Sequence, residues 1–150
     1  MIDALEPAAA ALLVAAVVAN GLQAGTYFAW ASGVMPGLAR VDDATFVSTM
    51  RQVNTAILNP VFLASFVGAP LLALLGALAC DGAALTWAAV GAAMAIATVV
   101  VTAAGNVPLN DALEAGGDRA AFEAPWVRWN VVRTLPSTAA LACLGWALTR

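Results

Sequence analysis

The chain has 150 residues, of which 63% are hydrophobic and only 10% are charged, and its formal net charge is −3. A water-soluble domain carries about 25% charged residues, so this composition indicates a membrane protein. The net negative charge argues against a nucleic-acid partner, and the lack of histidine excludes His-ligated haem, iron and most zinc sites.

Four long apolar stretches can be recognised, at about residues 8–34, 56–79, 84–105 and 131–149. A helix needs ~20 apolar residues to cross the hydrocarbon core, and each stretch approaches or exceeds that length. Backbone polar groups in lipid must be paired within their own segment, which favours helices. The sequence therefore predicts an all-α polytopic membrane protein. We expect one domain over residues 1–150, built as an antiparallel four-helix transmembrane bundle with an additional interfacial or kinked amphipathic helix.

The first stretch is expected to be a retained span, because residues 1–7 are acidic whereas a signal peptide begins with basic residues. Asn20, Gln23 and Tyr27 follow the spacing i, i+3, i+7, which places them on one side of a helix. Polar side chains are costly in lipid, so this side should face the protein interior. Met35-Pro36-Gly37 is predicted to break the helix.

An amphipathic helix should begin at Asp42 or Asp43, either of which can cap it. A kink or boundary is expected at Asn59-Pro60, since proline disfavours helix in the preceding residue. The helix either lies along the membrane surface or continues, bent, into the second span. Its polar side chains are Arg51, Gln52, Asn54, Thr55 and Asn59.

A turn at Cys80-Asp81-Gly82 joins the second and third spans, and the third ends in Asn106-Val107-Pro108-Leu109-Asn110. Two interpretations of these asparagines remain open. They either cap carbonyls that the proline leaves free or hold a polar ligand. Cys80 and Cys143 form no CxxC pair and are interpreted as small apolar residues.

Residues 111–125 are predicted to be a polar loop that Pro125 closes. The spacing i, i+4, i+7, i+11 then places Trp126, Asn130, Arg133 and Ser137 on one side of the fourth span. Trp129 lies one turn from Arg133. The tryptophans and the arginine are either interfacial anchors or groups that face inward.

Antiparallel connections bring the polar residues of all four spans to one end of the molecule. Five of the six arginines, at positions 40, 51, 119, 128 and 133, lie at that end. The positive-inside rule places it in the cytoplasm, with both termini outside. We expect an integral protein of the bacterial inner membrane, with the lipid bilayer as its environment and homo-oligomers as a further expectation.

Four segments together resemble the anthrone oxygenase family over about residues 10–149. They are Gly21–Tyr27 with Val34-Met35-Pro36, Met50–Asn54 with Asn59-Pro60, Asn106–Asn110, and Trp126–Arg133. The resemblance implies an enzyme that oxidises an anthrone or a quinol-like lipophilic polycycle with molecular oxygen. An anthrone loses a methylene proton to give an electron-rich enolate, which reacts with oxygen without a metal or flavin. No cofactor or metal is therefore expected.

The residues expected to act in such a reaction are Arg133, Asn130, Asn106 and Asn54, as a cation and amides near the enolate oxygen or a water. The residues expected to bind the substrate are Gln23, Tyr27, Arg51, Asn59, Asn110, Trp126 and Trp129. The candidates for the base are Asp111 and a water held by Asn54 and Asn59.

Two other functions are considered. A non-catalytic binding or scaffold protein could associate through its small-residue helix faces, because 12 glycines and many alanines favour close helix contacts. A transporter fits less well, because the chain has few charges in its spans and no pair of broken helices.

Overall fold

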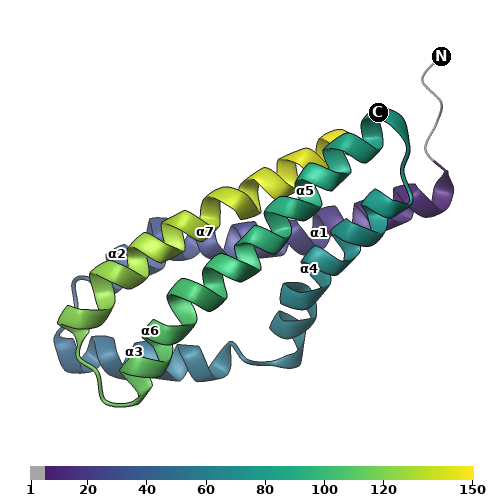
Figure 1. Ribbon diagram of the computed structural model, residues 1–150. Helices are drawn as coiled ribbons and strands as arrows, with labels where there is room; N and C mark the ends of the chain where they lie inside the picture. The colour runs from purple at the N-terminus through teal and green to yellow at the C-terminus, as the bar shows by residue number, and fades with distance from the viewer. Residues whose placement is uncertain (1–5) are drawn as a thin grey trace.

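The computed structural model describes residues 6–150, whose regular structure is entirely helical (Figure 1). The helices are α1 (Pro7–Ala29), η1 (Trp30–Val34), α2 (Met35–Leu38), α3 (Asp43–Ala56), α4 (Pro60–Leu78), α5 (Gly82–Val101), η2 (Thr102–Asn106), α6 (Val107–Glu114) and α7 (Arg119–Ala147). The segments η1 and η2 are single π-helical turns. They make α1–η1–α2 and α5–η2–α6 two continuous long helices.

The long helices lie side by side and alternate in direction (Figure 1). The helix α1 packs against α4 and α7, and α5 packs against the same two helices. The start of α1, the α4–α5 turn and the end of α7 lie at one end of the molecule. The opposite end, here called the polar end, contains α2, α3, α6 and the start of α7. The antiparallel order predicted from the sequence places the polar residues at this end.

Three helical segments are long and apolar enough to cross a membrane: Pro7–Leu38, Pro60–Leu78 and Gly82–Glu114. The chain is therefore an integral membrane protein. The helix α7 is not among these three, and it carries the charged residues Arg119, Glu123, Arg128 and Arg133.

Small residues form the part of the core that lies away from the polar end. Ala73, Ala88 and Ala140 are fully buried where α4, α5 and α7 meet. A methyl group added at Gly91 would lie 2.7 Å from Cγ of Leu144, which is closer than carbon atoms pack. The helices approach this closely because alanine and glycine line their contacts.

Several local predictions are confirmed. Asp42 caps α3, accepting a hydrogen bond of 3.0 Å from the Thr45 backbone N–H. A separate helix, α4, begins at Pro60, as the Asn59-Pro60 pair indicated. Cys80 is buried in the core, between α4 and α5.

Three predicted boundaries are wrong. The chain does not break at Met35-Pro36-Gly37, because the π-helical turn lets the helix continue to Leu38. Residues 111–125 are not a loop, since α6 extends to Glu114 and α7 begins at Arg119. Asp118, not Pro125, defines the start of α7, and its side chain accepts a hydrogen bond from the Ala121 N–H. A hydropathy profile detects only the apolar stretches. It therefore did not reveal that the helices continue into the polar segments beside them.

Candidate functional site

Arg133 is buried near the polar end without an acidic partner among the described residues. Its side chain is on α7 and is 8% exposed, and Nε and Nη2 both donate to Oδ1 of Asn130, at 3.0 and 2.8 Å. The ion pairs found within residues 6–150 involve only Arg119. A buried charge is costly unless it is paired. The neutral amide of Asn130 holds the Arg133 guanidinium in place but does not neutralise its charge. That charge can therefore pair with an anionic ligand.

Two aromatic rings enclose the Arg133 guanidinium. Its central carbon lies 4.2 Å from the centre of the Tyr27 ring and 5.2 Å from the centre of the Trp126 ring. Both distances are in the range of cation–π attraction. Asn130 completes the arrangement, because its Nδ2 donates to the Tyr27 backbone carbonyl at 3.1 Å. The polar sides of α1 and α7 that the sequence predicts therefore meet at Arg133.

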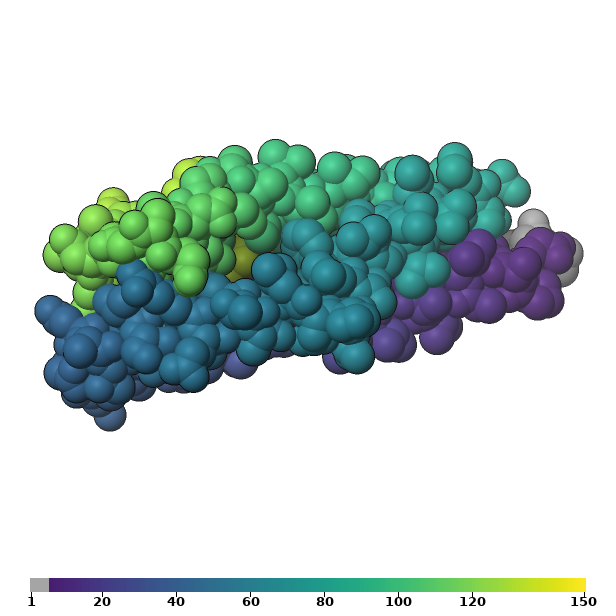
Figure 2. Space-filling view, turned by 90° about the horizontal axis from the view of Figure 1, so that it is seen from below, coloured from purple at the N-terminus to yellow at the C-terminus, as the bar shows by residue number. Residues whose placement is uncertain are grey.

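This group opens into a cavity of about 130 Å³, here called the Arg133 pocket. The pocket is lined by Thr26, Tyr27, Trp30, Val53, Asn54, Ile57, Leu58, Phe62, Leu63, Phe66, Thr102, Val107, Asn110, Trp126 and Arg133. Most of these side chains are apolar, and none is acidic. Figure 2 shows a hollow between α3 and α6, with α7 visible in its depth; α3, α6 and α7 all contribute lining residues. The volume suits one ring of a ligand, since whole ligands usually occupy about 300–1,000 Å³.

Two asparagines from the third predicted span hold Trp126. Asn110 Oδ1 accepts a 2.8 Å hydrogen bond from the Trp126 indole Nε1, and Asn106 Nδ2 donates to the Trp126 carbonyl at 3.2 Å. They do not cap carbonyls freed by Pro108, which was one of the two interpretations of the sequence. Asn106 Oδ1 is buried and has no hydrogen-bond partner within residues 6–150.

A chain of hydrogen bonds fixes Tyr27 from behind. Its hydroxyl donates to Gln23 Oε1 at 2.6 Å, Gln23 Nε2 donates to Ser65 Oγ at 2.8 Å, and Ser65 Oγ donates to the Phe62 carbonyl at 2.8 Å. Gln23 is buried and lies outside the pocket lining. It therefore ties α1 to α4 and orients Tyr27.

The two π-helical turns flank the pocket. Trp30 begins η1 and Thr102 begins η2, and both side chains line the cavity. Each turn lies just before a proline, Pro36 or Pro108. In an α-helix the proline ring would clash with the carbonyl four residues earlier, and a wider turn avoids this clash. Such π-helical turns occur frequently at functional sites.

Besides Gln23, three predicted binding residues lie outside the pocket, and the predicted catalytic residues Asn106 and Asn130 stand behind its lining without being part of it. Arg51 donates from Nε and Nη2 to the Leu113 carbonyl at the end of α6, at 2.9 and 2.7 Å. Asn59 caps α4 by accepting from the Phe62 N–H. Trp129 faces away from the pocket and covers Gly105, whose absent side chain leaves room for the indole. The candidate base Asp111 is exposed on α6 and does not line the pocket.

The aromatic residues that α4 and η1 contribute to the pocket were not predicted from the sequence. Phe62 and Phe66 stack with ring centres 5.7 Å apart, and Trp30 lies edge-on to Trp126 at 5.3 Å. The spacing i, i+4 of the phenylalanines directly after Asn59-Pro60 was the available signal. Without knowledge of which side of α4 faces inward, that signal did not distinguish pocket residues from lipid-facing ones.

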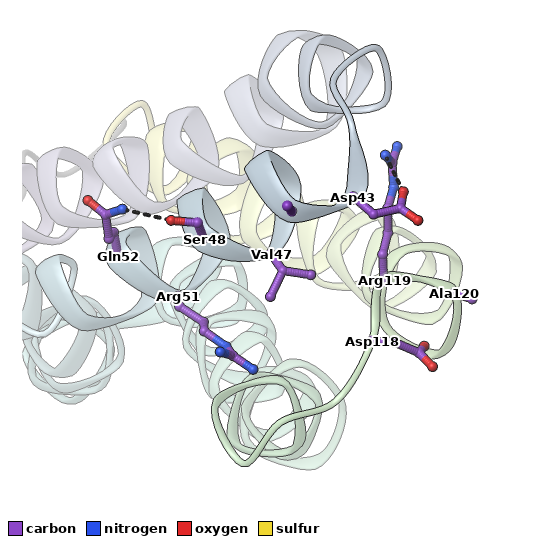
Figure 3. A pocket seen from close by; sticks show the side chains of 9 residues that line it. Asp43, Val47, Ser48, Arg51, Gln52, Asp118, Arg119 and Ala120 are labelled. Atoms are coloured by element: carbon purple, nitrogen blue, oxygen red, sulfur yellow. Dashed lines mark hydrogen bonds and ion pairs between the residues drawn. The ribbon is translucent and has the colours of Figure 1, made fainter.

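A larger hollow of about 700 Å³ lies on the outer surface between α3 and the start of α7 (Figure 3). Its charged side chains already have partners. Arg119 pairs with Glu123 and Asp43 at 2.6 and 3.1 Å and also donates to the carbonyls of Val41 and Ala39. These contacts hold the start of α7 against the α2–α3 connection. The hollow is open and remote from Arg133, so the smaller pocket is the better candidate site.

No group of three or more potential metal-ligating residues occurs in the described part of the chain. The Arg133 pocket instead offers one cation, the two amides of Asn54 and Asn110, and flat aromatic surfaces. Such a set stabilises negative charge on a planar ligand, because fixed donors in a dry site favour the charged form.

The comparisons with known proteins give one match. The family model described as anthrone oxygenase matches residues 46–143, which include Asn54, Asn106, Asn110, Trp126 and Arg133. Neither the curated proteins nor the solved structures gave a match. Since the matched segment covers well over half of the chain, the protein belongs to the anthrone oxygenase family.

Proposed function

We propose that the protein is a membrane-embedded oxygenase that acts on a lipophilic anthrone- or quinol-like polycycle with molecular oxygen and without a His-ligated metal. The observation that carries this proposal is Arg133, a buried cation without an acidic partner in residues 6–150 that opens into an aromatic pocket. We place the protein in the bacterial inner membrane, with α7 as the fourth member of a transmembrane bundle beside α1, α4 and α5.

The proposed reaction begins with loss of a proton from the anthrone methylene. The enolate reacts with one molecule of oxygen, and the methylene becomes a carbonyl while one molecule of water is released. Two hydrogens and four electrons leave the carbon centre, and oxygen is the oxidant. The role of the protein is to favour the enolate and to hold it in an apolar cavity that oxygen enters readily.

Arg133 would bind the enolate oxygen, and Asn130 would keep the guanidinium in position. Tyr27 and Trp126 would hold the guanidinium by cation–π contacts, while Asn106 and Asn110 fix Trp126. No carboxylate lines the pocket, so Asn54 is the side chain best placed to hold a water that accepts the proton.

Oxygen uptake in detergent micelles containing anthrone tests this proposal. The wild-type protein should exceed the spontaneous rate, and Arg133→Ala should lower the catalysed rate by about 100–1,000-fold, as expected for the loss of a donor to a developing anion. The matched control is Arg128→Ala, an exposed arginine one and a half turns earlier on α7. Equal catalysed rates for wild type and Arg133→Ala, at equal amounts of folded protein, would remove the proposal.

The scaffold alternative is less well supported. It rested on glycine and alanine faces that would be free to bind a partner. Many of these residues, such as Ala73, Ala88 and Ala140, pack α4, α5 and α7 against one another within the chain.

A further inference from the structure

A second cavity lies next to the Arg133 pocket, on the outer surface of the molecule. This groove has a volume of about 460 Å³ and lies between α1 and the joint of α3 and α4. It shares Thr26, Val53, Ile57 and Phe62 with the pocket. The two cavities are therefore neighbours that are separated only by the side chains they share.

Of the exposed residues that line the groove, Leu22, Ala56 and Val61 are apolar and Asn59 is polar. Leu22 is 58% exposed on α1 and Val61 is 82% exposed on α4. In a membrane protein, such side chains face acyl chains. The other opening of the pocket, between α3 and α6, instead carries the amides Asn54 and Asn110. The pocket thus has a polar side and an apolar side.

The volumes of the two cavities indicate the size of the ligand that they can hold. The Arg133 pocket alone suits a single ring, whereas pocket and groove together match the usual size of a ligand site. We infer that the groove is the bilayer-side extension of the Arg133 pocket. A lipophilic phenol or enol places its acidic ring beside Arg133 and its remaining rings or tail between α1 and α4. This inference rests on the proposed function for the identity of the ligand class.

The arrangement defines how the substrate arrives and how the proton leaves. A lipophilic molecule dissolved in the bilayer slides past Phe62 with its acidic ring leading. The proton leaves on the opposite side, past Asn54, where the opening is polar. The Ile57–Asn59 connection between α3 and α4 contributes to both cavities, since Ile57 lines both, Leu58 lines the pocket and Asn59 lines the groove.

The test compares two ligands of different length. The short probe is 4-nitrophenol, whose single ring fits the pocket and whose absorbance reports ionisation. The long probe is 1,8-dihydroxyanthraquinone, which has three fused rings and does not consume oxygen. Ala56→Trp fills the groove from the end of α3, and Ala64→Trp on α4 is the control, since Ala64 is exposed and lines neither cavity.

Ala56→Trp should weaken binding of the long probe by about 10-fold or more, because burial of an aromatic ring is worth at least that factor, and should change binding of the short probe less than about 2-fold. Ala64→Trp should change neither. If Ala56→Trp leaves the long probe unaffected, an acyl chain occupies the groove or the ligand extends between α3 and α6, and the inference is overturned. An equal loss for both probes also overturns it, because the groove would then act only through the pocket. Failure of the proposed function is distinct: both probes would bind while oxygen uptake stays at the spontaneous rate.

Discussion

Asn130 is the residue that makes the charge of Arg133 available. It accepts from two guanidinium nitrogens and donates to the Tyr27 carbonyl, so it satisfies Arg133 without neutralising it. A carboxylate at this position would accept the same two hydrogen bonds from Arg133 and add a negative charge, but it could not donate to the Tyr27 carbonyl. The neutral amide therefore avoids an ion pair with Arg133, as the proposed anion-binding role of this arginine requires.

Asn130→Asp should consequently weaken anion binding, and it should also lower the stability of the fold by about 1–3 kcal/mol because the Tyr27 carbonyl loses its donor. We expect the affinity for 4-nitrophenolate to fall by about 10-fold or more, because the new carboxylate competes for the guanidinium. Thermal unfolding in detergent checks that the variant is folded, and absorbance titration gives the affinity. Binding of the anion at the wild-type level would mean that Arg133 is not the group that recognises it.

For single residues, the sequence predicts whether a side chain faces the interior better than it predicts which group that side chain binds. The spacing of Asn20, Gln23 and Tyr27 correctly placed all three in the interior, because a lipid-facing carboxamide is too costly. It did not reveal that Arg51 and Asn59 bind backbone carbonyl and N–H groups at helix ends. The same side-chain donors and acceptors serve a helix terminus or a ligand, and only the fold decides between them.

Among the elements that were not predicted from the sequence, the two π-helical turns affect the site most. Prolines at 36 and 108 were interpreted as helix-breaking or capping signals, yet both helices continue through a widened turn. Tertiary packing makes the difference, since α7 lies against both η1 and η2. A proline predicts a local disturbance, and neighbouring helices determine whether the helix ends there.

The contact of η2 with α7 yields a stability prediction. A Cβ at Gly105 would lie 2.2 Å from the Trp129 ring, so Gly105→Ala must displace the indole. We expect a loss of about 1–3 kcal/mol in the free energy of unfolding, as for other overpacked contacts. Gly25→Ala is the matched control, because a Cβ there meets nothing within 4 Å; it should stay within about 1 kcal/mol of wild type. Unfolding by denaturing detergent measures both, and equal stabilities would show that Trp129 does not pack on Gly105.

For the whole molecule, hydropathy predicted four antiparallel spans, and three of them are helices long and apolar enough to cross a membrane. The fourth, at residues 131–149, lies almost entirely in α7, which is not among those three. The extent of the long helices beyond the apolar stretches was not predictable, because their polar ends are ordered by contacts such as those of Arg119. The arrangement at the polar end therefore depends on pairings between distant segments, which a hydropathy pattern does not contain.

Orientation in the membrane gives a prediction at the same scale. Five of the six arginines lie at positions 40, 51, 119, 128 and 133, at or near the polar end, so this end should face the cytoplasm. Alkaline phosphatase fused after Arg150 should be active, since the enzyme works only outside the cytoplasm. The same enzyme inserted at Gly116, in the α6–α7 connection, should be inactive. The reverse pattern would invert the proposed orientation.

The central claim is that the Arg133 pocket favours the ionised form of an acidic lipophile. Absorbance titration of anthrone under nitrogen, in micelles with and without the protein, measures this directly, because oxygen cannot consume the enolate. Bound to the wild-type protein, anthrone should ionise with an apparent pKa about 1–3 units below its value in empty micelles, since a nearby cation favours the charged form. Arg133→Gln should abolish the shift. An unchanged pKa in the presence of the wild-type protein would contradict the account.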